Sequence, residues 1–126
     1  MSAATADIPA GEATAHGRTL TRLLAEYERK LTEIRREAVR VRSAFARGGD
    51  LDPAGRDLDA VRTLLGTVEP AATLLVSQAS QWLDHAAPRG SAEETELAVR
   101  LAEFEPLLRA ARLAVRDAVR DADRVR

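Results

Sequence analysis

Apolar residues recur at alternating spacings of four and three along most of this 126-residue chain. One run of this kind extends from Leu20 to Phe45, a second from Leu58 to Ala86, and a third from Leu97 to Val125, each without a skipped position. A seven-residue repeat keeps one narrow apolar face on an α-helix, and such faces pack together at a shallow left-handed crossing. The pattern therefore predicts three long helices that share one core.

Short turn signals separate the three runs. The glycine pair at 48–49 favours a left-handed stop after the first helix, and Asp52 followed by Pro53 is typical of an N-cap with proline at the first helical position. Residues 88–90 end the second run, and residues 91–94 fit a capping box that begins the third. Because short turns between long helices favour antiparallel neighbours, we predict an all-α, up-down-up antiparallel three-helix bundle with heptad packing.

A Glu-Pro dipeptide lies inside each of the last two helical patterns. An interior proline removes a backbone hydrogen bond and costs about 3 kcal/mol. In the heptad register Pro70 and Pro106 both fall at position f, which faces away from the apolar seam. We predict that the second and third helices are kinked at Pro70 and Pro106. Two alternatives are a hinge or docking surface at the kinks, and a proline that divides its helix in two.

The glutamates of these dipeptides occupy position e of their heptads. Arg35 and Lys30 lie at a matching height on the first helix, at positions e and g. Antiparallel helices pair e with e, and parallel helices pair g with e. We therefore expect surface ion pairs between Arg35 and Glu69 and between Lys30 and Glu105, each contributing well under about 1 kcal/mol.

Composition indicates a single domain. Charged residues make up 31% of the chain and aromatic residues only 3%, which is typical of helical bundles and coiled coils. Residues 1–17 are rich in Ala, Thr and Gly and are predicted to form a flexible N-terminal tail, followed by the three-helix bundle domain over 18–126. The formal net charge of −1 gives no global attraction to nucleic acid or to an anionic membrane. No stretch has the pattern of a signal peptide or a membrane span, so we expect a cytoplasmic protein.

The residues needed for common catalytic and metal chemistry are scarce. The chain has no cysteine, and its two histidines are His16 in the predicted tail and His85 in the last turn of the second helix. The acidic cluster at 93–96 is explained as favourable charge in the first turn of a helix. We predict no catalytic residue, no metal site, no cofactor and no small-molecule ligand, and keep a helical enzyme with an unrecognised site as an alternative.

Apolar residues outside the three seams lead to the main functional prediction. They indicate a surface that another helix covers, from a second copy of the chain or from another protein. We predict a non-catalytic helical protein-protein interaction module, serving as an adaptor, a scaffold or a self-associating component of a homo-oligomer. Scattered surface hydrophobes are the alternative explanation. The predicted interface comprises Val99, Pro106, Leu107, Ala110 and Leu113 of the third helix and Leu64, Val76 and Leu83 of the second.

Arginines are concentrated near the end of the first helix and the end of the third. In the predicted bundle these segments lie at the same end, which suggests a small nucleic-acid-associated protein as an alternative function. Aspartates interleave with the arginines, so internal ion pairing is favoured over nucleic-acid binding. The residues of this alternative site are Arg36, Arg40, Arg47, Arg112, Arg116 and Arg120.

Overall fold

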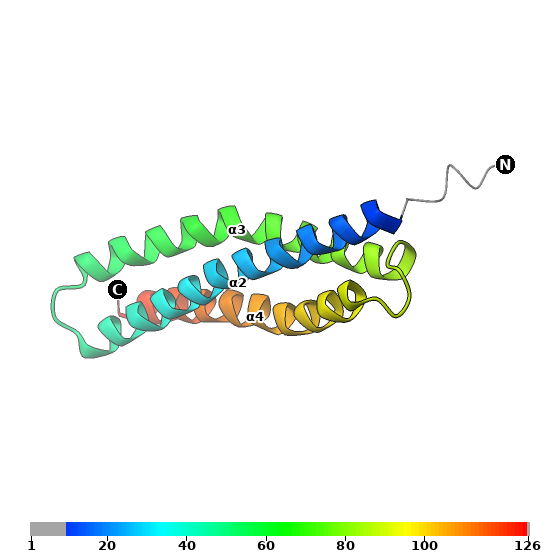
Figure 1. Ribbon diagram of the computed structural model, residues 1–126. Coiled ribbons are helices and arrows are strands. Elements are labelled where there is room, and N and C mark those ends of the chain that lie inside the picture. Colours follow the sequence, from blue (N-terminus) through cyan, green and yellow to red (C-terminus); the bar gives the residue numbers. More distant parts are fainter. Residues whose placement is uncertain (1–9, 126) are drawn as a thin grey trace.

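Three long helices packed around one core form the part of the protein that the structure describes (Figure 1). The computed structural model describes residues 10–125, in which α2 spans Ala10–Arg47, α3 spans Asp52–His85 and α4 spans Ala92–Arg124. This part of the chain contains no β-strand. The prediction of an all-α fold with three helices is confirmed.

Contacts near the helix ends show how α2 and α3 lie against each other. The Trp82 indole nitrogen, in the last turn of α3, donates to the carbonyl oxygen of Ala13 at the start of α2 at 3.0 Å. At the other end of the molecule, Arg40 late in α2 pairs with Asp57 early in α3 at 2.9 Å. The beginning of α2 therefore lies beside the end of α3.

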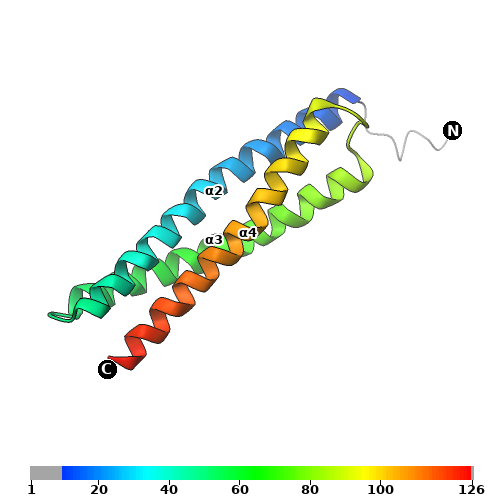
Figure 2. The same cartoon turned by 90° about the horizontal axis from the view of Figure 1, so that it is seen from below.

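Helix α4 lies start to start with α2 (Figure 2). The guanidinium of Arg18 is 3.1 Å from the carboxylate of Glu93, and both residues are near the beginnings of their helices. The Arg42 Nε donates to the Asp121 carboxylate at 2.7 Å near the two ends. Together these contacts tie α2 to α4 along most of its length.

The core is built from the residues of the three apolar runs. Its largest fully buried side chains include Leu31 and Ile34 of α2 and Leu97 and Phe104 of α4. No polar or charged side chain is buried among the residues that the structure describes. The fold therefore depends on apolar burial, which contributes about 25 cal/mol per Å² removed from water.

Helix α2 begins well before the boundary expected from the sequence. The predicted flexible tail at 1–17 is wrong for residues 10–17, which form the first two turns of α2, whereas residues 1–9 lie outside the described part of the chain. Ala13 and Gly17 are buried against the Trp82 indole, which lies so close that a Cβ added at Gly17 would stand 2.4 Å from a ring carbon. This contact with the far end of α3 explains why a segment of small residues is helical.

The two turns follow the predicted chemistry in part. Gly48 and Gly49 have φ values of 76° and 81°, the left-handed conformation that glycine adopts without strain. Asp52 is not the N-cap of α3. Leu51 holds that position, and the Asp52 amide donates to the carboxylate of Asp50 at 3.1 Å.

The capping box of α4 is present in a modified form. The Ser91 hydroxyl accepts from the Glu94 amide at 3.1 Å, as expected. The Glu94 carboxylate accepts from the amide of Gly90 at 2.9 Å. The first interaction satisfies an amide that the first turn leaves without a helical partner, and the second satisfies the amide of the residue before the N-cap.

The two interior prolines do not interrupt their helices. Pro70 lies inside α3 and Pro106 inside α4, and both are exposed to solvent. The alternative in which a proline divides its helix is wrong.

Replacement of Gly17 by alanine tests the contact between α2 and Trp82. Because the added methyl group would overlap the indole, Gly17→Ala should lower the free energy of unfolding by about 1 to 3 kcal/mol. The matched control is Gly11→Ala on the same helix, where a Cβ meets no atom within 4 Å. Urea denaturation should show the control equal to or slightly more stable than the parent chain. Equal midpoints for all three proteins would show that α2 does not pack on Trp82.

Candidate functional site

One side of α4 faces α2 and is held there by ion pairs. The α4 residues involved, Glu93, Arg100 and Asp121, are separated by multiples of seven and so lie on one side of the helix. Leu107 and Ala114 continue the same series between Arg100 and Asp121, and both are half-buried against the core. The partners on α2 are Arg18, Glu28 and Arg42.

The opposite side of α4 faces α3. Arg112 forms an ion pair with Glu69 of α3, and its Nη2 also donates to the Thr73 hydroxyl at 3.2 Å. This side of α4 also carries Arg109 and Arg116, which are i−3 and i+4 from Arg112. The seam between α3 and α4 is therefore bordered by arginines of α4.

The ion pairs predicted for the Glu-Pro glutamates are wrong. Glu69 pairs with Arg112 and not with Arg35. Lys30 makes no ion pair with Glu105, and its Nζ lies 5.4 Å from the centroid of the Tyr27 ring. The heptad pattern does not determine which side of the first helix faces the second helix. In the structure, α3 meets the side of α2 that carries Arg40, which is the reverse of the predicted arrangement.

An exposed apolar line lies on the outer side of α4, between the sides that face α2 and α3. Val99, Pro106 and Leu113 form this line, which we call the α4 ridge, and they are spaced seven residues apart. The exposed fraction is 55% for Val99 and 48% for Leu113, and Pro106 is also exposed. The α4 ridge is a single stripe about 21 Å long at the helical rise.

The flank of the α4 ridge toward α2 is apolar. Leu107 and Ala110 lie there and are half-buried. Val39 of α2, 51% exposed, borders the same seam because it precedes Arg42 by one turn and Arg42 lies 3.8 Å from Asp117 of α4. We call Val39, Leu107 and Ala110 the apolar flank. The sequence analysis missed Val39, although an apolar residue outside the seam of the first helix was a signal for it.

The three interface residues predicted on α3 do not join the α4 ridge. Val76 and Leu83 follow Glu69 at intervals of seven, so they line the α3/α4 seam, where both are half-buried against the core. Leu64 follows Asp57 by seven residues and lies on the side of α3 that faces α2. The eight predicted interface residues thus occupy three separate places, and only the five on α4 are gathered on one surface.

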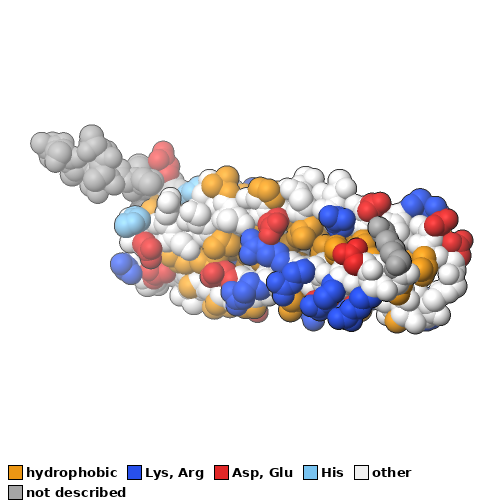
Figure 3. Space-filling model, turned by 180° about the vertical axis from the view of Figure 1, so that it is seen from behind, with side chains coloured by type: hydrophobic (Ala, Val, Ile, Leu, Met, Phe, Trp, Pro, Cys, Tyr) orange, Lys and Arg blue, Asp and Glu red, His pale blue; other side chains and the backbone are white. Residues whose placement is uncertain are grey.

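An open hollow surrounds Leu113. Arg109, Arg112, Leu113 and Arg116 line it, and its exposed surface is mostly hydrocarbon. Arg112 is fixed by Glu69 and Thr73, whereas Arg109 and Arg116 have no ion pair with a carboxylate of the described residues. We call these three arginines the basic flank. Figure 3 shows the rear face of the molecule, where basic side chains gather in one band beside hydrophobic side chains.

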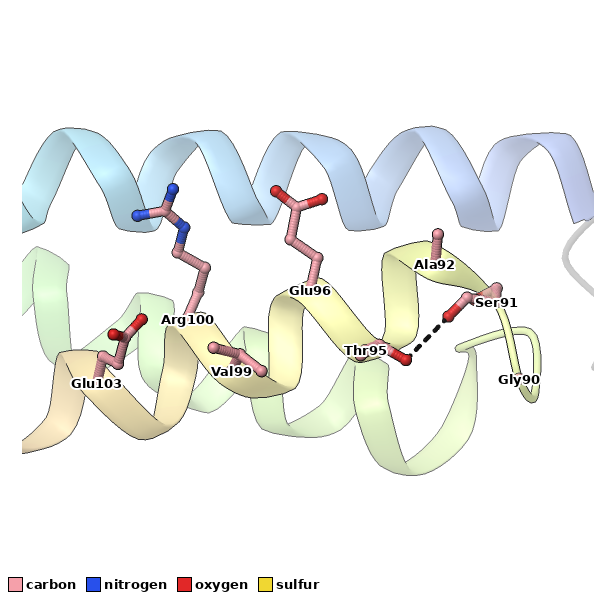
Figure 4. A pocket seen from close by; sticks show the side chains of 8 residues that line it. All are labelled: Gly90, Ser91, Ala92, Thr95, Glu96, Val99, Arg100 and Glu103. Carbon is pink, nitrogen blue, oxygen red and sulfur yellow. Dashed lines mark hydrogen bonds between the residues drawn. The ribbon is translucent and has the colours of Figure 1, made fainter.

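A second hollow lies around Val99 at the beginning of α4 (Figure 4). In Figure 4 the side chains of Glu96 and Arg100 point toward α2, and Glu103 lies one turn further along. Arg100 is held by Glu28 at 3.2 Å. This half of the α4 ridge is therefore bordered by the carboxylates of Glu96 and Glu103, in contrast to the arginines around Leu113. The residues lining the hollow are Gly90, Ser91, Ala92, Thr95, Glu96, Val99, Arg100 and Glu103.

The six arginines predicted for nucleic acid do not form one surface. Arg40 borders the α2/α3 seam through Asp57, whereas Arg112 borders the α3/α4 seam through Glu69. Arg36 pairs with Glu33 and Arg120 with Asp117 (2.9 and 2.5 Å). Arg47 and Arg116 form no ion pair with a carboxylate in the part of the chain that the structure describes.

The shifted pKa values belong to surface ion pairs that join helices or adjacent turns. The hydrogen bond from Arg42 lowers the pKa of Asp121, and the same interaction raises the pKa of Arg42. The hydrogen bond from Arg40 lowers the pKa of Glu37, while Glu37 and Asp57 raise the pKa of Arg40. In each case the charged form is favoured, which is the behaviour of structural ion pairs.

Two further site types were sought in the described residues. Over 10–125 there is no group of three or more His, Cys, Asp or Glu side chains arranged to hold a metal ion. None of the three described helices has the combination of length and apolar character that a membrane span requires.

No protein-family model, curated protein or solved structure matches this chain.

Removal of the Arg42 side chain tests the α2/α4 ion pair through its pH dependence. Because the folded-state pKa of Asp121 is lowered, the stability from this pair is present above the ordinary aspartate pKa of about 3.9 and is lost as the pH falls through the folded value. Arg42→Met should thus be less stable than the parent chain at pH 7, with a smaller difference in urea midpoint at low pH.

Arg35→Met is the matched control, because Arg35 lies on the same helix and has no ion pair with a described carboxylate. Its difference from the parent chain should be the same at both pH values. A pH-independent effect of Arg42→Met would contradict the assignment of the shift to this pair.

Proposed function

We propose that this chain is a non-catalytic helical module that binds another protein, or a second copy of itself, through the α4 ridge and its apolar flank. The observation that carries the proposal is the alignment of Val99, Pro106 and Leu113 on the outer side of α4, with Val99 and Leu113 about half exposed. An apolar stripe spaced by seven residues is the surface on which a further helix packs. Isolated surface hydrophobes have no reason to repeat at this interval.

The neighbours of the α4 ridge support the same proposal. Val39, Leu107 and Ala110 extend the apolar surface from α4 across the seam to α2. The ion pairs Glu28–Arg100 and Arg42–Asp121 border this stretch at its two ends. The patch is thus a central apolar area with a charged rim, which is the usual anatomy of a protein interface.

The ionisable groups support a non-catalytic role. Those whose pKa values shift are Glu37, Arg40, Arg42 and Asp121, and each is engaged in an ion pair on the surface. A catalytic acid or base is instead tuned away from its charged form or toward neutral pH.

We also propose that the helices form an up-down-up bundle with heptad packing, and that Pro106 bends the α4 ridge to fit its partner. The amide that Pro106 lacks leaves the Ala102 carbonyl without its helical hydrogen bond, so α4 curves most easily at this point. Pro70 has the same relation to Gly66 in α3.

Substitution of the ridge leucine tests the proposed interface. Because Leu113 is exposed, Leu113→Glu should change the free energy of unfolding by less than about 0.5 kcal/mol while abolishing partner binding. The matched control is Leu74→Glu on α3, where the leucine is 59% exposed and lies outside the α4 ridge and the apolar flank. Sedimentation velocity over a concentration series measures self-association, and affinity capture on immobilised chain measures binding of other proteins.

The control should retain the assembly or the captured protein that Leu113→Glu loses. The proposed interface would be refuted if the parent chain and Leu113→Glu had the same assembly state and captured the same proteins.

Replacement of the prolines tests whether they are kept for packing or for the shape of the ridge. Pro106→Ala restores a helical amide at an exposed site, so it should raise the free energy of unfolding by up to about 3 kcal/mol and weaken partner binding. Pro70→Ala on α3 is the comparison and should raise stability without affecting binding. Lower thermal stability of Pro106→Ala would instead assign the proline to packing of the core.

A further inference from the structure

We infer that the partner of the α4 ridge is an amphipathic helix with acidic residues along one flank. This inference rests on the proposed interaction role and adds the chemistry of the partner. The hollow around Leu113 presents a hydrocarbon surface with three guanidinium groups around it, Arg109, Arg112 and Arg116. A side chain that fills the hollow brings its neighbours within reach of these arginines.

The arginines of the basic flank differ in how free they are to pair with a carboxylate of a partner. Arg112 is held by Glu69 and Thr73, which fixes one guanidinium at the edge of the hollow. Arg109 and Arg116 have no described carboxylate partner and lie seven residues apart on the same side of α4. Two carboxylates about two helical turns apart on a partner would pair with them, and such a spacing is natural on a helix that lies along α4.

Charge along the α4 ridge also sets the direction of the partner. Glu96 and Glu103 border the half of the ridge near Val99 (Figure 4). The arginines of the basic flank border the half near Leu113. An acidic flank is repelled at the first half and attracted at the second. The carboxylates of the partner must therefore lie over the Leu113 half, while its apolar stripe covers both.

A second copy of the chain does not supply these carboxylates. In an antiparallel pair centred on Pro106, Arg109 and Arg116 would stand at the levels of Glu103 and Glu96 of the second copy. Those glutamates lie on the α2 side of the α4 ridge, whereas a two-fold axis would bring the α3 sides of the two ridges together, so they would not face the arginines. In a parallel pair Arg116 would meet Asp117, whose carboxylate already accepts from Arg120 at 2.5 Å. The basic flank is thus better matched by a different protein.

A nucleic acid fits the surface less well than an acidic helix. The centre of the basic flank is the exposed side chain of Leu113. Of the other predicted nucleic-acid arginines, Arg120 is paired with Asp117, and Arg36 and Arg40 lie on α2 in ion pairs with Glu33 and Asp57. Phe45, Trp82 and Phe104 are buried, so they present no ring on which bases stack.

Three synthetic peptides test the inference by fluorescence anisotropy with the full chain. Each is about 21 residues, roughly three heptads long, and helical. The first has leucines at intervals of seven with glutamates on one flank, the second has the same leucines with lysines in place of the glutamates, and the third keeps the glutamates but has serine at the leucine positions. A random DNA duplex is the fourth probe.

The glutamate peptide with leucines should bind at least about tenfold more tightly than the lysine peptide at low salt, and added salt should reduce this preference. The double variant Arg109→Glu/Arg116→Glu should reverse the preference. The matched control is Arg22→Glu/Arg29→Glu on α2, two exposed arginines with the same seven-residue spacing and the same change of net charge. The control should keep the preference of the parent chain.

Each other outcome overturns the inference in an identifiable way. Equal binding of the glutamate and lysine peptides, lost in Leu113→Ser, would remove the acidic preference and leave the interaction role intact. Tighter binding of the duplex than of any peptide, with the same dependence on Arg109 and Arg116, would assign the basic flank to nucleic acid. Absence of binding by all four probes would reject the acidic helix, while the interaction role is tested separately by self-association and capture.

Discussion

Burial of the apolar side chains between the three helices is the interaction on which the rest of this protein depends. No polar or charged side chain is buried among the described residues, and the buried hydrogen bond from the Trp82 indole nitrogen to the Ala13 carbonyl lies at one end of the bundle, so apolar packing specifies most of the core. Long helices of this composition gain most of their stability from packing and little from intrinsic propensity. The ion pairs lie outside the core, where pairs such as Arg42–Asp121 and Arg112–Glu69 bridge neighbouring helices at the surface. These ion pairs show which sides of α2, α3 and α4 face one another. They therefore also show which side of α4 is not covered by another helix of the described chain.

The free side of α4 is where structure and proposed function come together. The same helix contributes Leu108 and Ala111 to the core and Pro106 and Leu113 to the outer surface, because its apolar residues are not confined to one side. The outer residues have no partner within the described chain. With the apolar flank toward α2 and the basic flank toward α3, the α4 ridge offers a helix both an apolar stripe and a charge that sets its orientation.

Much of the fold could be predicted from the sequence, and the remainder has definite physical causes. The spacing of residues such as Leu24, Leu31 and Ile34 predicts a helix with one apolar side, and the structure confirms three such helices. The start of α2 could not be predicted because Gly17 is buried by Trp82, a residue distant in sequence, and a small residue gives no sign of such a contact. The ion pair of Glu69 was predicted wrongly because an apolar repeat does not determine which side of the first helix meets the second. The α4 ridge was predictable as a periodic pattern, whereas the separation of Leu64 from it follows from the arrangement of helices in space.

The most direct test of the account is to locate the binding surface at the level of single side chains. Leucine and valine methyl groups lie both on the α4 ridge and on surfaces outside it. Methyl NMR of the full chain during titration with a partner helix therefore shows which of these surfaces binds the helix. The account predicts shifts or broadening at Val39, Val99, Leu107 and Leu113, with Leu64 and Leu74 unchanged. Perturbation centred on Leu64 and Leu74, with the methyl groups of the α4 ridge unaffected, would contradict it.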